Sequence, residues 1–177
     1  MSITALRNAL PDYAEDLKLN LDALASETVL SEQQKWGCFL AAAYAVGVPQ
    51  VVRAVRGEVD AKLNAAAQKG AKTATAILAM NTVYYSAVNL LNNHDYRAEP
   101  PKLSMRALSY AGVDRIDFEL WCLTVSAVNE CGACLNAHES DLHKRNVSLE
   151  RIQAALRIAA VIGAVSAVLR AEAAAGA

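Results

Sequence analysis

The stretch LERIQAALRIAAVIGAVSAVLRAEAA, residues 149–174, decides the fold class of this chain. It contains no proline and is rich in alanine, the residue with the highest helix propensity. Asn146-Val-Ser148 stands directly before it and supplies side-chain oxygens that can cap a helix. The stretch therefore predicts one long helix from Leu149 to about Ala174.

The rest of the chain shows the same bias. Alanine occupies 36 of the 177 positions, the four prolines all lie within the first 101 residues, and no run alternates apolar and polar residues over strand length. These features predict an all-α fold. Further helices are expected from Pro11-Asp12 onward and over residues 31–46, 49–58, 60–68, 72–92, 114–128 and 131–145. A loop is expected over 92–101, and Lys69 and Lys72 are expected in a solvated turn.

Length and charge exclude several classes of function. The 177 residues suit a single domain, 1–177, and 54% of them are hydrophobic. Lys+Arg 17 against Asp+Glu 18 leaves no basic surplus for nucleic acid or for an anionic membrane surface. The longest uncharged stretch, 73–93, is too polar for a membrane span, and no signal peptide is visible. We therefore expect a cytoplasmic protein.

A weak internal repeat is visible at an offset of 85 residues. It aligns Trp36 with Trp121 and Gly47 with Gly132, together with several alanines and isoleucines. The two copies would cover about 12–92 and about 114–175. Only the second copy contains a C-x-x-C pair and histidines, so we expect the reactive site only there.

The segment Cys131-Gly-Ala-Cys134-Leu-Asn-Ala-His138 carries that chemistry. Spacings of three and four residues place both cysteines and His138 on one face of a helix. Cys131 would lie at the helix start, where free N–H groups favour a thiolate, and His138 can take the proton of Cys134. Glu119, twelve residues before Cys131, can approach His138 if the intervening turn folds the helices together.

Other interpretations of these residues are available. A zinc site would use Cys131, Cys134, His138 and Glu119, but the chain has no second spaced ligand pair, so no metal is expected. A thioredoxin domain would need strands. Cys38 and Cys122 lie in apolar stretches and are expected in the core. Aromatic residues expected in the core or at subunit contacts are Trp36, Trp121, Phe118 and the pair Tyr84-Tyr85.

Glu119 followed by Cys131, Cys134 and His138 resembles the E-(x)11-C-x-x-C-x-x-x-H motif of the AhpD-type alkyl hydroperoxide reductases, in the carboxymuconolactone decarboxylase superfamily. The resemblance extends over essentially the whole chain, including Trp36-Gly37, Met80-Asn81 and Phe118-Glu-Leu-Trp121. It implies an all-helical fold of two related halves, a homotrimer, and a thiol-dependent peroxidase with no bound cofactor.

The resemblance also implies residue roles and partners. Cys134 would attack the peroxide and become a sulfenic acid, and Cys131, the more accessible cysteine, would donate a proton and close the Cys131–Cys134 disulfide. Glu119 and His138 would relay the proton of Cys134. Electrons would come from dihydrolipoyl groups of an acyltransferase, recharged by dihydrolipoamide dehydrogenase, and pass on to the peroxiredoxin AhpC through a mixed disulfide with Cys131.

Two residues depart from the family pattern. Ala133 stands where a His is found in the best-known members, and Glu130 stands where a Gly is usual. The negative charge of Glu130 should raise the pKa of the neighbouring Cys131 thiol. Two alternative functions stay open: a non-enzymatic adaptor that only relays disulfides, and a decarboxylase or isomerase of the wider superfamily that works without the cysteine pair.

Overall fold

The computed structural model describes residues 2–109 and 112–176, and within them the chain is helical without strands. This confirms the all-α prediction. The helices are α1 Ile3–Asn8, α2 Glu15–Ser26, α3 Glu32–Val46, α4 Pro49–Lys62, α5 Ala65–Leu90, α6 Arg106–Ser109, α7 Arg115–Val128, α8 Gly132–Lys144 and α9 Leu149–Ala175, with 3-10 turns η1 Asp12–Ala14 and η2 His94–Arg97.

Local capping residues set several of these boundaries. Ser31 and Gln34 form a reciprocal capping box at the start of α3, and Gly47 ends that helix in a left-handed conformation with φ of 69°. Ser148 accepts a hydrogen bond from the Arg151 amide at the start of α9. The predicted helix from Leu149 is thus confirmed, as is the helix over residues 31–46.

Two predictions for residues 60–72 were wrong. The expected short helix over 60–68 does not exist, because α4 continues to Lys62 and α5 begins at Ala65 behind an Asn64 cap. The expected turn at Lys69–Lys72 is part of α5, where Gly70 is buried. Asn64 is a common cap residue, and packing of the following alanines explains why the helix starts seven residues earlier than predicted.

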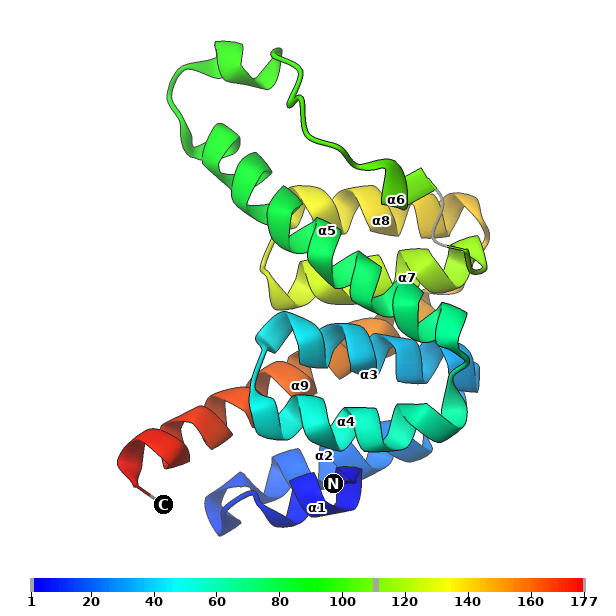
Figure 1. Cartoon of the computed structure of the whole chain (residues 1–177), viewed down its shortest axis with the longest axis vertical. Coiled ribbons are helices and arrows are strands. Elements are labelled where there is room, and N and C mark those ends of the chain that lie inside the picture. The colour runs from blue at the N-terminus through cyan, green and yellow to red at the C-terminus, as the bar shows by residue number, and fades with distance from the viewer. Residues whose placement is uncertain (1, 110–111, 177) are drawn as a thin grey trace.

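Two helices, α3 and α7, form the centre of the molecule. Figure 1 shows α3 in the middle, α4 and the α1–α2 pair on one side, and α7 and α8 on the other. α3 packs against α4, α5, α7 and α9, and α7 packs against α3, α5, α8 and α9. α5 crosses α7 and projects beyond the body, and the chain returns through η2 toward α6 (Figure 1).

Trp121 fixes the distance between the central helices. Its indole lies on the backbone of two other helices: a Cβ at Gly37 would fall 2.0 Å from Nε1, and one at Gly70 would fall 2.9 Å from Cζ3. Nε1 donates a hydrogen bond to the Gln34 carbonyl. Asp117, one helical turn earlier on α7, accepts a bond from the Gln34 side chain at 2.8 Å. These contacts hold α7, and with it Glu119, against α3 and α5.

The aromatic residues expected in the core or at subunit contacts differ in their burial. Trp36, Phe118 and Trp121 are buried, which confirms them as core residues. Tyr84 and Tyr85 are only half-buried and contact each other edge to face.

α9 is long and mostly apolar. By length and composition it could cross a membrane, but half of its most hydrophobic window is buried inside the protein. It packs against α2, α3 and α7. Packing in the protein core therefore explains the apolar composition of α9.

The helix boundaries follow the same offset as the proposed repeat. Adding 85 to the bounds of α3, α4 and α5 reproduces those of α7, α8 and α9 to within three residues. The division into halves at about 12–92 and 114–175 stays a prediction, now with a matching order and length of helices.

Candidate active site

The turn between α7 and α8 positions Cys131. The Cys131 amide donates to the Ser126 carbonyl at 3.0 Å, and the Glu130 amide donates to the Ala127 carbonyl at 3.1 Å. This is the Schellman pattern that closes many helices, and it places Glu130 at the position that takes a left-handed conformation, φ 54°. Glycine is favoured at that position, which explains physically why a glycine is usual there in the resembled family.

Cys131 is the N-cap of α8, as the sequence predicted. Its sulfur accepts a hydrogen bond from the Cys134 amide, with a donor–acceptor distance of 3.3 Å. The four unpaired amides of a helix start and its macrodipole stabilise negative charge on a sulfur held there. The backbone at the start of α8 thus favours the thiolate form of Cys131.

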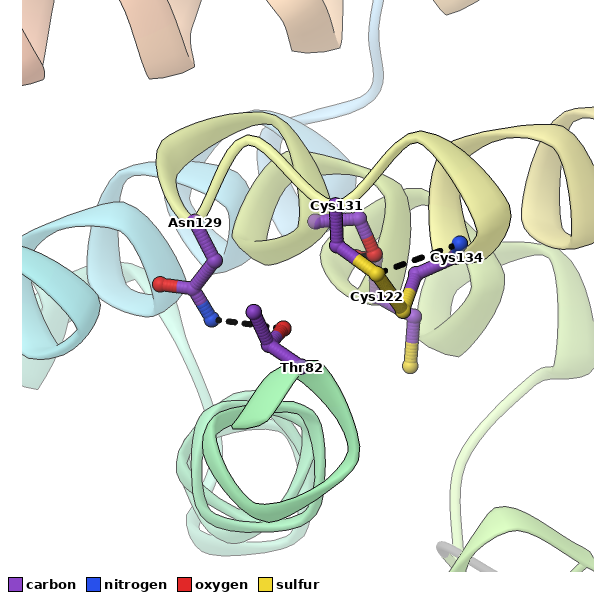
Figure 2. The surroundings of a disulfide bond; sticks show 6 residues. Thr82, Cys122, Asn129, Cys131 and Cys134 are labelled. Carbon is purple, nitrogen blue, oxygen red and sulfur yellow. Dashed lines mark hydrogen bonds between the residues drawn. A yellow bond between two sulfur atoms is a disulfide. The ribbon is translucent and has the colours of Figure 1, made fainter. Parts of the chain in front are cut away.

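Cys131 and Cys134 are joined by a disulfide (Figure 2). The relative exposure of Cys131 is 3% and that of Cys134 is 7%. The implied greater accessibility of Cys131 is therefore wrong for this oxidised form. As the N-cap, Cys131 directs its sulfur toward the Cys134 amide in the first turn of α8, whereas Gly132 and Ala133 between the two cysteines are exposed.

Glu119 and His138 are brought together from α7 and α8. His138 Nδ1 lies 2.6 Å from Glu119 Oε2, and Glu119 is only 2% exposed. A carboxylate only accepts hydrogen bonds, so Nδ1 carries the hydrogen and Nε2 of the neutral imidazole is free to accept a proton. His138 stands four residues after Cys134 on α8, one turn along the same face.

Sequence reasoning missed Arg115 at this site. Its Nη2 lies 2.5 Å from Oε1 of Glu119, the oxygen that His138 leaves free. The four-residue spacing on one helix, Arg115 to Glu119, is the signal that could have identified it. Asn129 was also missed as a contact: its side chain donates to Thr82 at 3.4 Å and joins the active-site turn to α5 (Figure 2).

Two further cysteines are free and buried, which confirms their expected place in the core. Burial raises the pKa of the Cys38 thiol to about 12. Cys122 is drawn among the surroundings of the disulfide in Figure 2. Burial, together with the nearby Glu119 carboxylate, raises the pKa of the Cys122 thiol well above its ordinary value. Both thiols are therefore poor nucleophiles at neutral pH.

The metal alternative gains no geometric support. Within residues 2–109 and 112–176, no three His, Cys, Asp or Glu side chains form a group that could hold an ion. Of the four ligands considered from the sequence, Cys131 and Cys134 bond to each other, and Glu119 and His138 form a hydrogen bond.

Comparisons with known proteins place this geometry in a family context. A family model described as the carboxymuconolactone decarboxylase family matches residues 100–177, which include the whole site. The chain is 52% identical over 174 residues to the alkyl hydroperoxide reductase AhpD of Hyphomonas neptunium, covering 98% of this chain and 97% of that protein. It is 51% identical over 172 residues to the same-named protein of Maricaulis maris, covering 97% of this chain and 99% of that one. A protein of that name from Caulobacter vibrioides is 49% identical over 175 residues, covering 98% and 96%.

Proposed function

Because this chain belongs to the AhpD alkyl hydroperoxide reductase family, we propose that it is an antioxidant enzyme that reduces organic hydroperoxides with Cys131 and Cys134. One observation carries the proposal most directly. The two cysteines form a disulfide at the start of α8, and a histidine paired with a buried carboxylate stands one turn further along the same face.

The first step is attack on the peroxide. His138 takes the proton of Cys134 on Nε2, while Glu119 holds Nδ1–H and stabilises the imidazolium. The Cys134 thiolate attacks one oxygen of ROOH, the O–O bond breaks, and the departing alkoxide takes up a proton to leave as ROH. Cys134 is then a sulfenic acid, Cys–SOH.

The second step closes the disulfide. The Cys131 sulfur attacks the sulfenic sulfur, its thiol proton joins the departing hydroxyl, and one water is released. The Cα atoms of Cys131 and Cys134 are 5.3 Å apart, within the span that a disulfide requires. A Cys131–Cys134 disulfide is the expected product of this step.

The third step returns the site to the dithiol. A dihydrolipoyl dithiol exchanges with the disulfide, first as a mixed disulfide and then as the oxidised lipoyl ring. We propose that the dihydrolipoyl group belongs to an acyltransferase and is reduced again by dihydrolipoamide dehydrogenase with NADH. The peroxiredoxin AhpC would be a further acceptor of electrons from this site. No bound cofactor is needed. A homotrimer, which rests on family membership, and the cytoplasmic location expected from the sequence complete the proposal.

The deciding experiment follows NADH consumption with dihydrolipoamide dehydrogenase, lipoamide and an organic hydroperoxide. We expect turnover by the wild-type protein and none by Cys134→Ser or Cys131→Ser. No turnover until AhpC is added would indicate the disulfide-relay adaptor instead. Activity on a carbon acid or lactone that survives replacement of both cysteines would indicate the other chemistry of the superfamily.

A further inference from the structure

The Glu119 carboxylate has two different partners, one for each oxygen. Oε2 faces His138 Nδ1 at 2.6 Å, and Oε1 faces Arg115 Nη2 at 2.5 Å. The Glu119 side chain is 3% exposed, whereas the Arg115 side chain is 40% exposed. The arginine therefore reaches inward from a position that solvent can enter.

Arg115 has one further hydrogen bond and one longer ion-pair contact. Its Nη1 donates to the Leu108 carbonyl of α6, and its Nε lies 3.7 Å from Oδ2 of Asp141 on α8. Asp141 accepts a hydrogen bond from Arg145 at 3.0 Å. Burial raises the pKa of the Asp141 carboxyl, but the hydrogen bond and charge of Arg145 and the charge of Arg115 outweigh it and leave that pKa below its usual value.

Charged and titratable groups surround Glu119 on two helices. Arg115 and Cys122 share its helix, and His138 comes from α8; Asp141 contacts Arg115 and Arg145 on the side away from Glu119. A buried carboxylate costs several kcal/mol unless its charge is balanced. Among residues 2–109 and 112–176, Arg115 is the permanent cation that contacts Glu119.

The contact between Arg115 and Glu119 affects the orientation of His138. With Oε1 held by Arg115, only Oε2 remains to accept a bond from Nδ1, so the carboxylate has one orientation toward the imidazole. Without Arg115 the carboxylate can rotate, and Nδ1–H is no longer fixed. Nε2 would then spend less time directed along α8 as the base for Cys134.

We propose that Arg115 is a positioning residue of this enzyme: it holds Oε1 of Glu119 so that Oε2 orients His138 to activate Cys134. The proposal rests on the peroxidase function given above and extends its relay from two residues to three. It also links the relay to α6, because the same guanidinium binds the Leu108 carbonyl.

The test measures activation of Cys134 directly. In the reduced full-length Cys131→Ser protein, the rate of Cys134 alkylation by iodoacetamide is followed across pH, with the modified residue identified by mass spectrometry. Arg115→Ala and Arg115→Gln are compared with Arg145→Ala, which removes another arginine bound to Asp141 but none that contacts Glu119. Guanidinium chloride at low millimolar concentration is added to Arg115→Ala, with urea at equal concentration as the neutral control.

We expect Arg115→Ala and Arg115→Gln to alkylate about tenfold more slowly at neutral pH, a smaller loss than the roughly 10²–10⁴-fold effect of a general base itself, because His138 remains in place. Guanidinium should restore part of the rate to Arg115→Ala through the exposed side of the site, urea should not, and Arg145→Ala should match the parent. A purely structural role would give no selective rescue.

Unchanged alkylation in both Arg115 variants, or equal effects of urea and guanidinium, would overturn the proposal. If Arg115→Ala does not fold, Arg115→Gln carries the test, because it keeps most of the side-chain volume and a donor. The measurement uses no peroxide. Arg115 dependence in a protein without peroxide turnover would therefore refute the proposed function and leave this inference standing.

Discussion

Glu119 and His138 are joined across two helices by a 2.6 Å contact between Oε2 and Nδ1, with the carboxylate almost completely buried. The contact fixes the imidazole tautomer, since a carboxylate has no hydrogen to donate. The same logic of carboxylate, histidine and nucleophile activates many enzymes. Here the nucleophile is one helical turn before the histidine, so the whole relay depends on how α7 packs against α8.

Glu119→Gln tests that contact. The amide keeps the shape but cannot stabilise the imidazolium, so peroxide turnover should fall by about tenfold or more. Because proton transfer from Cys134 then becomes less favourable, the pH–rate profile should move to higher pH. Stopped-flow peroxide reduction across pH measures both effects. Glu139→Gln is the matched control, as Glu139 is exposed on the same helix as His138; equal losses in both variants would argue against the relay.

The two active-site cysteines should fail in different ways. Cys134→Ser should lose all reaction with hydroperoxide, because no sulfur attacks the O–O bond. Cys131→Ser should consume one equivalent of peroxide and stop at a sulfenic acid that dimedone traps on Cys134. Mass spectrometry of the trapped protein separates the two. Dimedone adducts on Cys131 in the Cys134→Ser protein would reverse the assigned roles.

Cys38 and Cys122 should stay unmodified while the protein is folded. After reduction, iodoacetamide at pH 8 should label only Cys131 and Cys134, and all four cysteines should react after denaturation. The physical reason is burial, which raises the pKa of the Cys38 thiol to about 12 and moves that of Cys122 in the same direction. Cys122→Ala should therefore keep near-wild-type turnover, even though Cys122 lies near the disulfide; a large loss would give that thiol a part in the reaction.

The same two thiols predict a loss of stability in alkali. Free thiols in an unfolded chain ionise near pH 9.0, whereas the pKa of Cys38 in the folded protein is about 12. The unfolded state therefore binds fewer protons in this interval, and the free energy of unfolding should decrease as pH rises from about 9 toward 12. Urea denaturation at several alkaline pH values measures it, and Cys38→Ala should show a flatter decrease than the wild-type protein.

The parts of the site that the sequence predicted are those encoded within one helix. Cys131, Cys134 and His138 are separated by three and four residues, so helical geometry alone aligns them. The approach of Glu119 required a reversal at Asn129-Glu130, which the turn residues only suggested. Arg115 escaped notice because its role depends on the burial of Glu119, and burial is a tertiary property. The start of α5 was misplaced for the same reason: Lys69 and Lys72 resemble a turn until packing against Trp121 buries Gly70 between them.

Glu130→Gly should make the protein more stable. Glu130 has a left-handed φ of 54° at the end of α7, a conformation that costs a residue with a side chain about 1 kcal/mol more than glycine. Urea denaturation of the oxidised proteins should show a gain of about that size. Asn146→Gly is the control, because Asn146 has φ 59° in the same motif after α8 and asparagine tolerates this region. A Glu130→Gly protein no more stable than the wild-type protein would show that the conformation of Glu130 carries no such cost.

Gly37→Ala should destabilise the protein and disturb the site from a distance. The new Cβ would fall 2.0 Å from Nε1 of Trp121, so either the indole or the α3 backbone must move. Overpacking of this kind costs about 1–3 kcal/mol. Gly163→Ala is the matched control within helix α9: its Cβ would meet nothing within 4 Å, and alanine favours the helix by about 1 kcal/mol over glycine. Since Trp121 lies two residues after Glu119 on α7, Gly37→Ala should also slow Cys134 alkylation, whereas Gly163→Ala should not. A Gly37→Ala protein with wild-type stability and alkylation rate would show that the α3–α7 contact does not hold the relay in place.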